Sequence, residues 1–190
     1  MLQHAFKEWA VICQALASGR QAVIIRKGGI SEKDGTFQVD HQRFWLYPTY
    51  AHQQREGIKP EAEPHLEEVL AKRPLQGKVR LSHFAEVGAV YLVTDHYDAA
   101  KLAALHLWSD ATVGARFHNR QPGLVVIAVR LFQAKNAIEI VETPAMAGCK
   151  SWVELEKGLS TEGAKPVLND ISFHEVLNKV TFLLEPPAYA

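Results

Sequence analysis

Cations and aromatic rings are crowded together in residues 22–53, where their side chains could bind an anion or a planar ring. The first strand-like run of this stretch ends in Arg26-Lys27-Gly28-Gly29. Glycines allow backbone N–H groups to approach an anion closely, and the two cations add charge. This turn is therefore a candidate anion site, although it lacks the Gly-Lys-Ser/Thr half of a P-loop. The alternative is a hairpin turn flanked by solvated charges.

A second run in the same stretch alternates as a strand does. Phe44 and Leu46 share one face of this run, and Arg43, Trp45 and Tyr47 share the other. If only the first face enters the core, the second displays a cation and two rings, which is the composition of a stacking platform for nucleic-acid bases. The alternative is a strand buried on both faces, in which Trp45 and Tyr47 are packing residues.

A local basic zone covers residues 111–138, which contain four Lys or Arg residues and no Asp or Glu. Arg116, His118 and Arg120 lie close together in it, and such donors suit phosphate. Charge clusters are also common on ordinary solvated faces.

Recognition residues tend to sit where strands and loops meet at the rim of a sheet. We therefore expect cations from the three segments to face one concave surface, with Trp45 or Tyr47 at its floor. These cations are Arg26, Lys27, Arg43 and Arg120.

Histidines suggest a different chemistry, that of a small-molecule hydrolase. His41, His52 or His106 could serve as a general base, because imidazole titrates near neutral pH. A closed pocket that joins a histidine to Ser151 or Cys149 would favour this hypothesis. No metal or cofactor is predicted, because neither a Cys-x-x-Cys pair nor a His-Glu-x-x-His motif occurs.

Composition limits the class of protein. The chain has 190 residues, 47% of them hydrophobic, which suits one domain with a real core. Its 21 Lys and Arg residues balance 21 Asp and Glu residues, and this argues against a protein that coats long stretches of duplex. Two unclustered cysteines, no signal peptide and no apolar run of about 20 residues predict a cytoplasmic protein without membrane spans. The sequence does not indicate an oligomeric state.

Helical and strand periodicities predict a mixture of both element types. A helix is expected from the spacing of Leu2, Phe6, Trp9, Cys13 and Leu16. Further helices are expected at 61–73, 98–107, 110–117 and from Ser172, and capping boxes are expected at Ser151 and Ser172. Strands are expected at 22–26, 35–39, 43–47, 78–93 with a break near Gly88, 124–132 in the centre of the sheet, and 137–142 as its hairpin partner.

The order of these elements lacks strict βαβ alternation and favours the α+β class. We predict one domain over residues 1–190, with a frayed tail at 186–190. Its sheet is expected to be curved and mainly antiparallel, or a partly open small β-barrel, with the N-terminal helix packed on it. The alternative is a split β-α-β sandwich without barrel closure.

Three groups of peptides resemble the bacterial domain of unknown function 1802 family over roughly residues 2–180. They are Ala5-Phe-Lys-Glu-Trp-Ala with Ile-Ile-Arg-Lys-Gly-Gly-Ile, Phe37-Gln-Val with Arg43-Phe-Trp-Leu-Tyr-Pro-Thr, and His106-Leu-Trp-Ser with Ala147-Gly-Cys-Lys-Ser-Trp-Val. The resemblance implies no established activity or catalytic residues. It implies at most a loose association with restriction–modification systems.

A shorter pattern is similar to the opening of PUA-like barrels in the activating-signal-cointegrator-homology branch. Here a helix ending in Ser-Gly-Arg precedes a strand that closes on Ile-Arg-Lys-Gly. The resemblance implies a small barrel that binds nucleic acid or a modified nucleoside in a cleft beside this strand. Ile24 departs from the pattern, because that branch usually has an acidic residue at the corresponding place.

These observations lead to one main hypothesis and two alternatives for function. The main hypothesis is a nucleic-acid or nucleotide recognition module for single-stranded or modified nucleic acid. The alternatives are the hydrolase with a histidine base and an accessory domain that docks on a partner protein through the same aromatic residues.

Overall fold

The structure is a computed structural model that describes residues 1–27, 39–148 and 150–184. Gly28 and Gly29, Cys149, most of the predicted strand 35–39 and the tail at 186–190 lie outside the described residues. The strands are β1 (Leu2–Trp9), β2 (Val23–Arg26), β3 (Arg43–Thr49), β4 (Lys78–Val93), β5 (Leu124–Val141), β6 (Trp152–Leu159) and β7 (Lys165–Pro166). The α-helices are α1 (Ala10–Ala17), α2 (Glu63–Ala71), α3 (His96–Lys101), α4 (Asp110–His118) and α5 (Asp170–Leu184).

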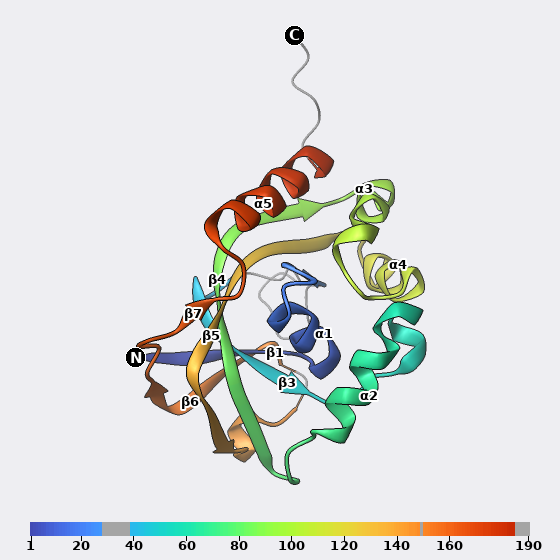
Figure 1. Ribbon diagram of the computed structural model, residues 1–190. Coiled ribbons are helices and arrows are strands. Elements are labelled where there is room, and N and C mark those ends of the chain that lie inside the picture. Colours follow the sequence, from blue (N-terminus) through green and yellow to red (C-terminus); the bar gives the residue numbers. More distant parts are fainter. Residues whose placement is uncertain (28–38, 149, 185–190) are drawn as a thin grey trace.

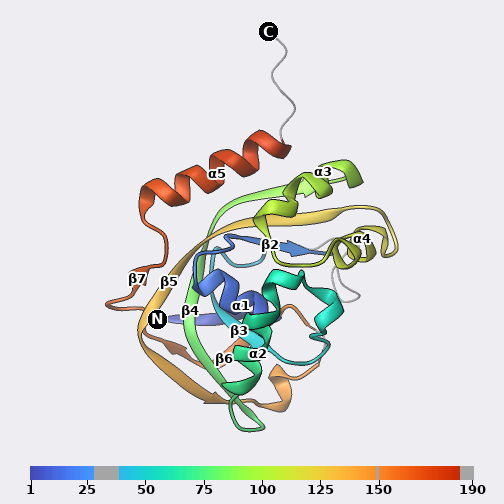
Figure 2. The same ribbon diagram turned by 45° about the vertical axis from the view of Figure 1, so that its right-hand side comes forward.

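All seven strands belong to one curved sheet (Figure 1). The order is β2-β5-β4-β3-β1-β6, with β7 paired to β5. Every pairing is antiparallel except that of β1 with β3. The described strands leave the sheet open, with α1 on its concave side and α5 across the outer side of β4 and β5 (Figure 2). The α+β class and the curved, mainly antiparallel sheet are thus confirmed.

β4 and β5 are the two longest strands of the sheet, and they pair with each other along most of their length. The predicted break at Gly88 is a bulge between Val87 and Ala89 within continuous β4. A side chain at Gly88 would come within 2.7 Å of the Phe173 ring on α5, so only glycine lets this helix approach. The predicted hairpin within residues 124–142 is wrong, because β5 continues through the predicted turn and pairs with β4 on both sides of it. The register shifts at this place, between the pairs His83–Gln133 and Leu81–Ile138.

The prediction of one N-terminal helix is wrong for the first half of that segment. Only its second half, α1, is helical, and residues 2–9 form β1. β1 lies between β3 and β6, so both of its edges are paired and both of its faces are covered. The spacing of Leu2, Phe6 and Trp9 reflects residues of a buried strand that continues directly into a helix.

Two hydrophobic clusters cover opposite faces of β3. Phe44 and Leu46 belong to the first cluster, which α1 and α2 also line. Trp45 and Tyr47 belong to the second, with 0% and 1% of their surface exposed. The prediction of an exposed stacking platform is therefore wrong for these two residues, and the alternative of a strand buried on both faces holds.

Capping explains two helix starts. The Ser109 hydroxyl accepts a hydrogen bond from the Thr112 N–H at the start of α4, as predicted. The last helix begins before the predicted Ser172, because the Asn169 side chain accepts from the Ser172 N–H. Ser151 caps no helix, since β6 follows it. No helix among the described residues is long and apolar enough to span a membrane.

Candidate anion-binding cavity

A cavity of about 700 Å³ opens where the ends of β1, β2 and β3 meet. Residues from the loop before β4, from α4 and from the segment before β6 complete its wall. Among the described residues, two acidic ones line it, Glu8 and Glu142. The basic lining residues in the same part of the chain are seven, Lys7, Arg26, Lys27, Arg73, Lys78, Arg116 and Lys150. In a chain with balanced charge, this excess of cations is local to the cavity.

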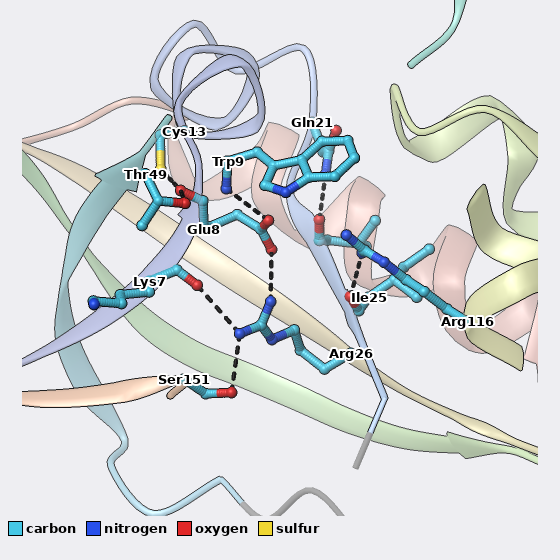
Figure 3. Close-up of polar contacts among 11 residues, drawn as sticks. Lys7, Glu8, Trp9, Cys13, Gln21, Ile25, Arg26, Thr49, Arg116 and Ser151 are labelled. Carbon is cyan, nitrogen blue, oxygen red and sulfur yellow. Dashed lines mark hydrogen bonds and ion pairs between the residues drawn. The ribbon is translucent and has the colours of Figure 1, made fainter. Parts of the chain in front are cut away.

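Arg26 lines this cavity and is held by hydrogen bonds, an ion pair and a ring contact, of which Figure 3 shows the polar contacts. Its Nη2 atom donates to the Lys7 carbonyl at 3.2 Å and to the Ser151 hydroxyl at 3.0 Å. Its Nη1 atom lies 3.6 Å from Glu8 Oε2. The guanidinium also lies 4.5 Å from the Phe6 ring centroid. Its side chain stays 18% exposed, so a preoriented cation faces the cavity.

Glu8 is the buried counter-charge of this group. Its side chain is fully buried, and its Oε1 atom accepts a hydrogen bond from the Trp9 N–H at 2.8 Å. Its Oε2 atom has no hydrogen-bond partner among the described residues and lies 3.6 Å from Arg26 Nη1. A carboxylate without water around it depends on nearby positive charge. Glu8 and Arg26 therefore stabilise one another and hold the end of β1 beside β2.

Arg116 brings a second guanidinium to the same region from α4. It donates to the Ile25 carbonyl at 3.0 Å and lies between the rings of Trp9 and Trp108, at 5.5 and 4.9 Å from their centroids. Burial lowers the pKa of Arg116, and the charge of Glu8 opposes that shift. An arginine remains protonated in such surroundings, so Arg116 adds a fixed positive charge.

Lys27 ties the turn after α4 to the end of β2. Its ammonium group donates to the carbonyls of Phe117 at 3.2 Å, Gly123 at 2.8 Å and Gln121. Burial lowers the pKa of Lys27. The sequence prediction that strand end and turn lie together is supported by these contacts, although Lys27 serves them partly as a structural clamp.

Aromatic rings and two further cations that contact them make up part of the remaining wall. Lys7 Nζ lies 5.2 Å from the Tyr47 ring centroid, and Arg73 lies 4.8 Å from that of Tyr50. Tyr47 donates its hydroxyl to Glu142 at 2.7 Å, and burial raises the pKa of Tyr47. Tyr47 is thus a wall residue that is fixed by the core rather than a free platform.

The other predicted site residues are distributed differently. Arg43 stands at the far end of β3 from the cavity, about 13 Å from Tyr47 along the strand at roughly 3.3 Å per residue, and pairs with Glu86 at 2.9 Å. Trp45 lies in the second core and not in the cavity. Arg120 is exposed, with φ of 62°, in the turn that Lys27 holds, but does not line the cavity. His118 lines a neighbouring hollow.

Of the three candidate histidine bases, only His52 lines the cavity. His41 stacks on His4 with 3.6 Å between ring centroids, and burial is the main cause of its lowered pKa. His106 is buried beside Trp108, away from the cavity. Ser151 lines the cavity as an acceptor for Arg26. Within the described ranges, no cluster of three or more His, Cys, Asp or Glu residues could hold a metal ion.

Buried His106 should make the protein less stable in acid. Burial lowers the pKa of His106 to about 4, and its Nδ1 atom has no hydrogen-bond partner within the described chain. The unfolded chain takes up this proton first, near pH 6.5, so stability is lost as pH falls from about 6.5 towards 4. The loss amounts to roughly 3 kcal/mol, at about 1.4 kcal/mol per pKa unit.

Urea titrations at pH 7 and pH 4 measure this effect. A His106→Asn variant should lose less unfolding free energy between the two pH values than the wild type does. His174→Asn, which removes an exposed imidazole on α5, is the matched control and should behave as the wild type. Equal pH dependence of His106→Asn and the wild type would contradict the prediction.

Sequence reasoning missed several residues of the cavity. Lys7 and Glu8 interrupt an otherwise apolar N-terminal run, and this interruption was the available signal. Arg73, Lys78 and Lys150 lie in loops or at strand ends far apart in the sequence. Nothing local distinguishes them from solvated charges, so only the folded chain reveals that they share one cavity.

The chain matches a known protein family over most of its length. The family described as Domain of unknown function (DUF1802) matches residues 5–179. The chain belongs to this family. The match includes all the described residues that line the cavity, which run from Lys7 to Ser151. No curated protein matches the chain in sequence.

Solved structures of ASCH from Zymomonas mobilis resemble this DUF1802 protein in fold. A crystal structure of a mutant form gives a TM-score of 0.48 at 10% identity and covers 94% of this chain and 98% of that chain. The crystal structure of ASCH itself gives 0.45 at 11% identity and covers 92% and 93%.

Proposed function

We propose that this protein recognises nucleotides or nucleic acid through the cationic cavity. The observation that carries the proposal is the local charge, seven Lys or Arg residues against two Glu residues in a chain with no net charge. Such a cavity favours an anionic ligand that carries phosphate. The half-buried rings of Trp9 and Tyr50 in its wall suit a ligand that also has a flat aromatic part.

The fixed geometry of the inner cations supports recognition of a specific ligand shape. Arg26 and Arg116 are each held by hydrogen bonds to backbone carbonyls and by aromatic rings. A cation that is already oriented loses little side-chain entropy when it binds phosphate. Arg73 and Lys150 at the rim are exposed and can adjust to the remaining charge. A link to restriction–modification is a further part of this proposal and rests on the family resemblance alone.

Binding titrations across salt concentration test the proposal. Fluorescence anisotropy with labelled single-stranded RNA and single-stranded DNA should detect binding at low salt, with a salt slope of only a few charges, and duplex DNA serves as the comparison. Substituting Arg73→Gln or Lys150→Gln should each weaken binding by about 1–2 kcal/mol, since each removes one charge-assisted contact.

Arg43→Gln is the matched control, because it removes an exposed cation that lies outside the cavity. Its affinity should equal that of the wild type. The proposal fails if no nucleic acid or nucleotide binds at low salt. It also fails if Arg43→Gln weakens binding as much as Arg73→Gln does.

A further inference from the structure

A second hollow of about 610 Å³ adjoins the cationic cavity. Both volumes are within the range of about 300–1,000 Å³ that is common for ligand pockets. Three residues line both of them, Trp9, His52 and Arg116. The two hollows therefore share one dividing wall, and a ligand that fills the first can continue into the second.

The dividing wall is rigid. A Cβ atom on Gly57 would lie 2.6 Å from the Trp9 ring, so this ring packs directly on the Gly57 backbone. On its other side the Trp9 ring lies 5.5 Å from the Arg116 guanidinium. Arg116 uses one of its five N–H donors on the Ile25 carbonyl. A phosphate at the wall would thus meet a cation that is already in place.

The second hollow has a different chemistry from the cationic cavity. Its lining away from the wall is largely uncharged and combines apolar Ala111 and Ala115 with polar side chains. Of the polar ones, Gln54, His118 and Asn119 are exposed to solvent. Glu56 is its one acidic lining residue and Arg116 its one Lys or Arg among the residues described. Amide and imidazole groups pair with the polar edges of a nucleobase, whereas phosphate is better served by the seven cations of the first cavity.

We infer that the protein binds single-stranded nucleic acid across both hollows, with one nucleotide in the cationic cavity and the next nucleoside in the second hollow. This inference rests on the proposed function and gives it a substrate class. The phosphodiester that links the two nucleosides crosses the wall at Arg116. The second base enters the hollow only when it is unpaired, so a single strand fits and a closed duplex does not.

Competition with small nucleotides tests the inference. The probes are nucleoside 3′,5′-bisphosphates and the corresponding 5′-phosphorylated dinucleotides, each used as a mixture of all bases. The bisphosphate carries more negative charge than the dinucleotide but lacks the second nucleoside. Any gain in affinity of the dinucleotide therefore reports the second hollow and not charge. We expect a gain of about tenfold, as one additional base contact typically gives.

Substitutions in the second hollow test whether the higher affinity for the dinucleotide arises there. His118→Ala and Asn119→Ala should each reduce the affinity for the dinucleotide towards that for the bisphosphate, and should leave bisphosphate binding unchanged. Gln121→Ala is the matched control, because it removes an exposed amide from the same turn without touching either hollow. It should bind both probes as the wild type does.

Each outcome decides between the two proposals. Equal affinities for bisphosphate and dinucleotide would overturn the inference and leave nucleotide recognition in place. Loss of both probes on His118→Ala would also overturn it, because the residue would then serve the first cavity. If neither probe binds the wild type, the proposed function and this inference fail together.

Discussion

A Trp45→Ala variant should lose about 3–5 kcal/mol of unfolding free energy, the usual cost of truncating a fully buried tryptophan. The Trp45 ring is 0% exposed and packs edge-on against Phe84, with 5.6 Å between ring centroids. Its Nε1 atom donates to the Leu2 carbonyl at 3.1 Å, which anchors the start of β1. Truncation leaves a void in the second core and also removes the partner of a backbone carbonyl. Urea denaturation followed by circular dichroism measures the loss.

Tyr97→Ala is the control for this experiment, since it removes an aromatic ring that is 71% exposed. Its effect on stability should stay within about 0.5 kcal/mol. Trp45→Phe should lie between the two variants, because it keeps a ring but not the hydrogen bond. A Trp45→Ala protein with wild-type stability and no nucleic-acid binding would contradict the core assignment and revive the platform interpretation.

The elements that the sequence predicted well are those with strong local signals. Ser109 provides the cap that begins α4, and Pro60 is the first residue of the 3₁₀ turn that leads into α2. The apolar run 124–129 lies between two other strands, in β5, as its composition indicates. Such signals depend on a few neighbouring residues, so they can be interpreted without knowledge of the fold.

The errors have a common origin in contacts between distant parts of the chain. β1 is a strand because β3 and β6 pair with its two edges, and the nearest of these begins at Arg43. β5 continues past the predicted turn at Lys135 because β4 is long enough to pair with it on both sides, up to Gln133 and again from Ile138. Local periodicity contains no information on such partners. It therefore assigned a helix to β1 and a hairpin to β5.

The contrast between local sequence signals and long-range contacts also explains which cavity residues could be predicted. Arg26, Lys27 and Arg116 could be predicted as site residues because each belongs to a dense local cluster of donors, although Arg26 and Arg116 come together only through β2 and α4. Arg43 belongs to an equally dense cluster, yet β3 carries it away from the others. Charge density along a sequence identifies candidates, and the direction of each strand decides which of them meet.

Glu8→Gln should cost about 3–5 kcal/mol, the range found when one member of a buried ion pair is removed. Glutamine keeps the shape and can still accept the hydrogen bond from the Trp9 N–H, so the loss reports charge. Arg26 would lose its counter-charge at 3.6 Å, and Arg116 would lose the charge that opposes its own pKa shift. Two cations would then stand close together with no anion between them. Urea denaturation at constant salt measures the change.

Glu86→Gln is the matched control, because it removes an exposed carboxylate that pairs with Arg43 at 2.9 Å. Exposed ion pairs contribute at most about 1 kcal/mol, so this variant should remain close to the wild type.

Added inorganic phosphate tests whether the site that Glu8 leaves empty binds an anion. If the cavity binds phosphate, added phosphate should raise the melting temperature of Glu8→Gln more than that of the wild type, since it replaces the missing negative charge. A Glu8→Gln protein as stable as the wild type would show that the cluster needs no counter-charge. A variant that is unstable but does not respond to phosphate would show that Glu8 is needed for the fold and that its removal creates no anion site.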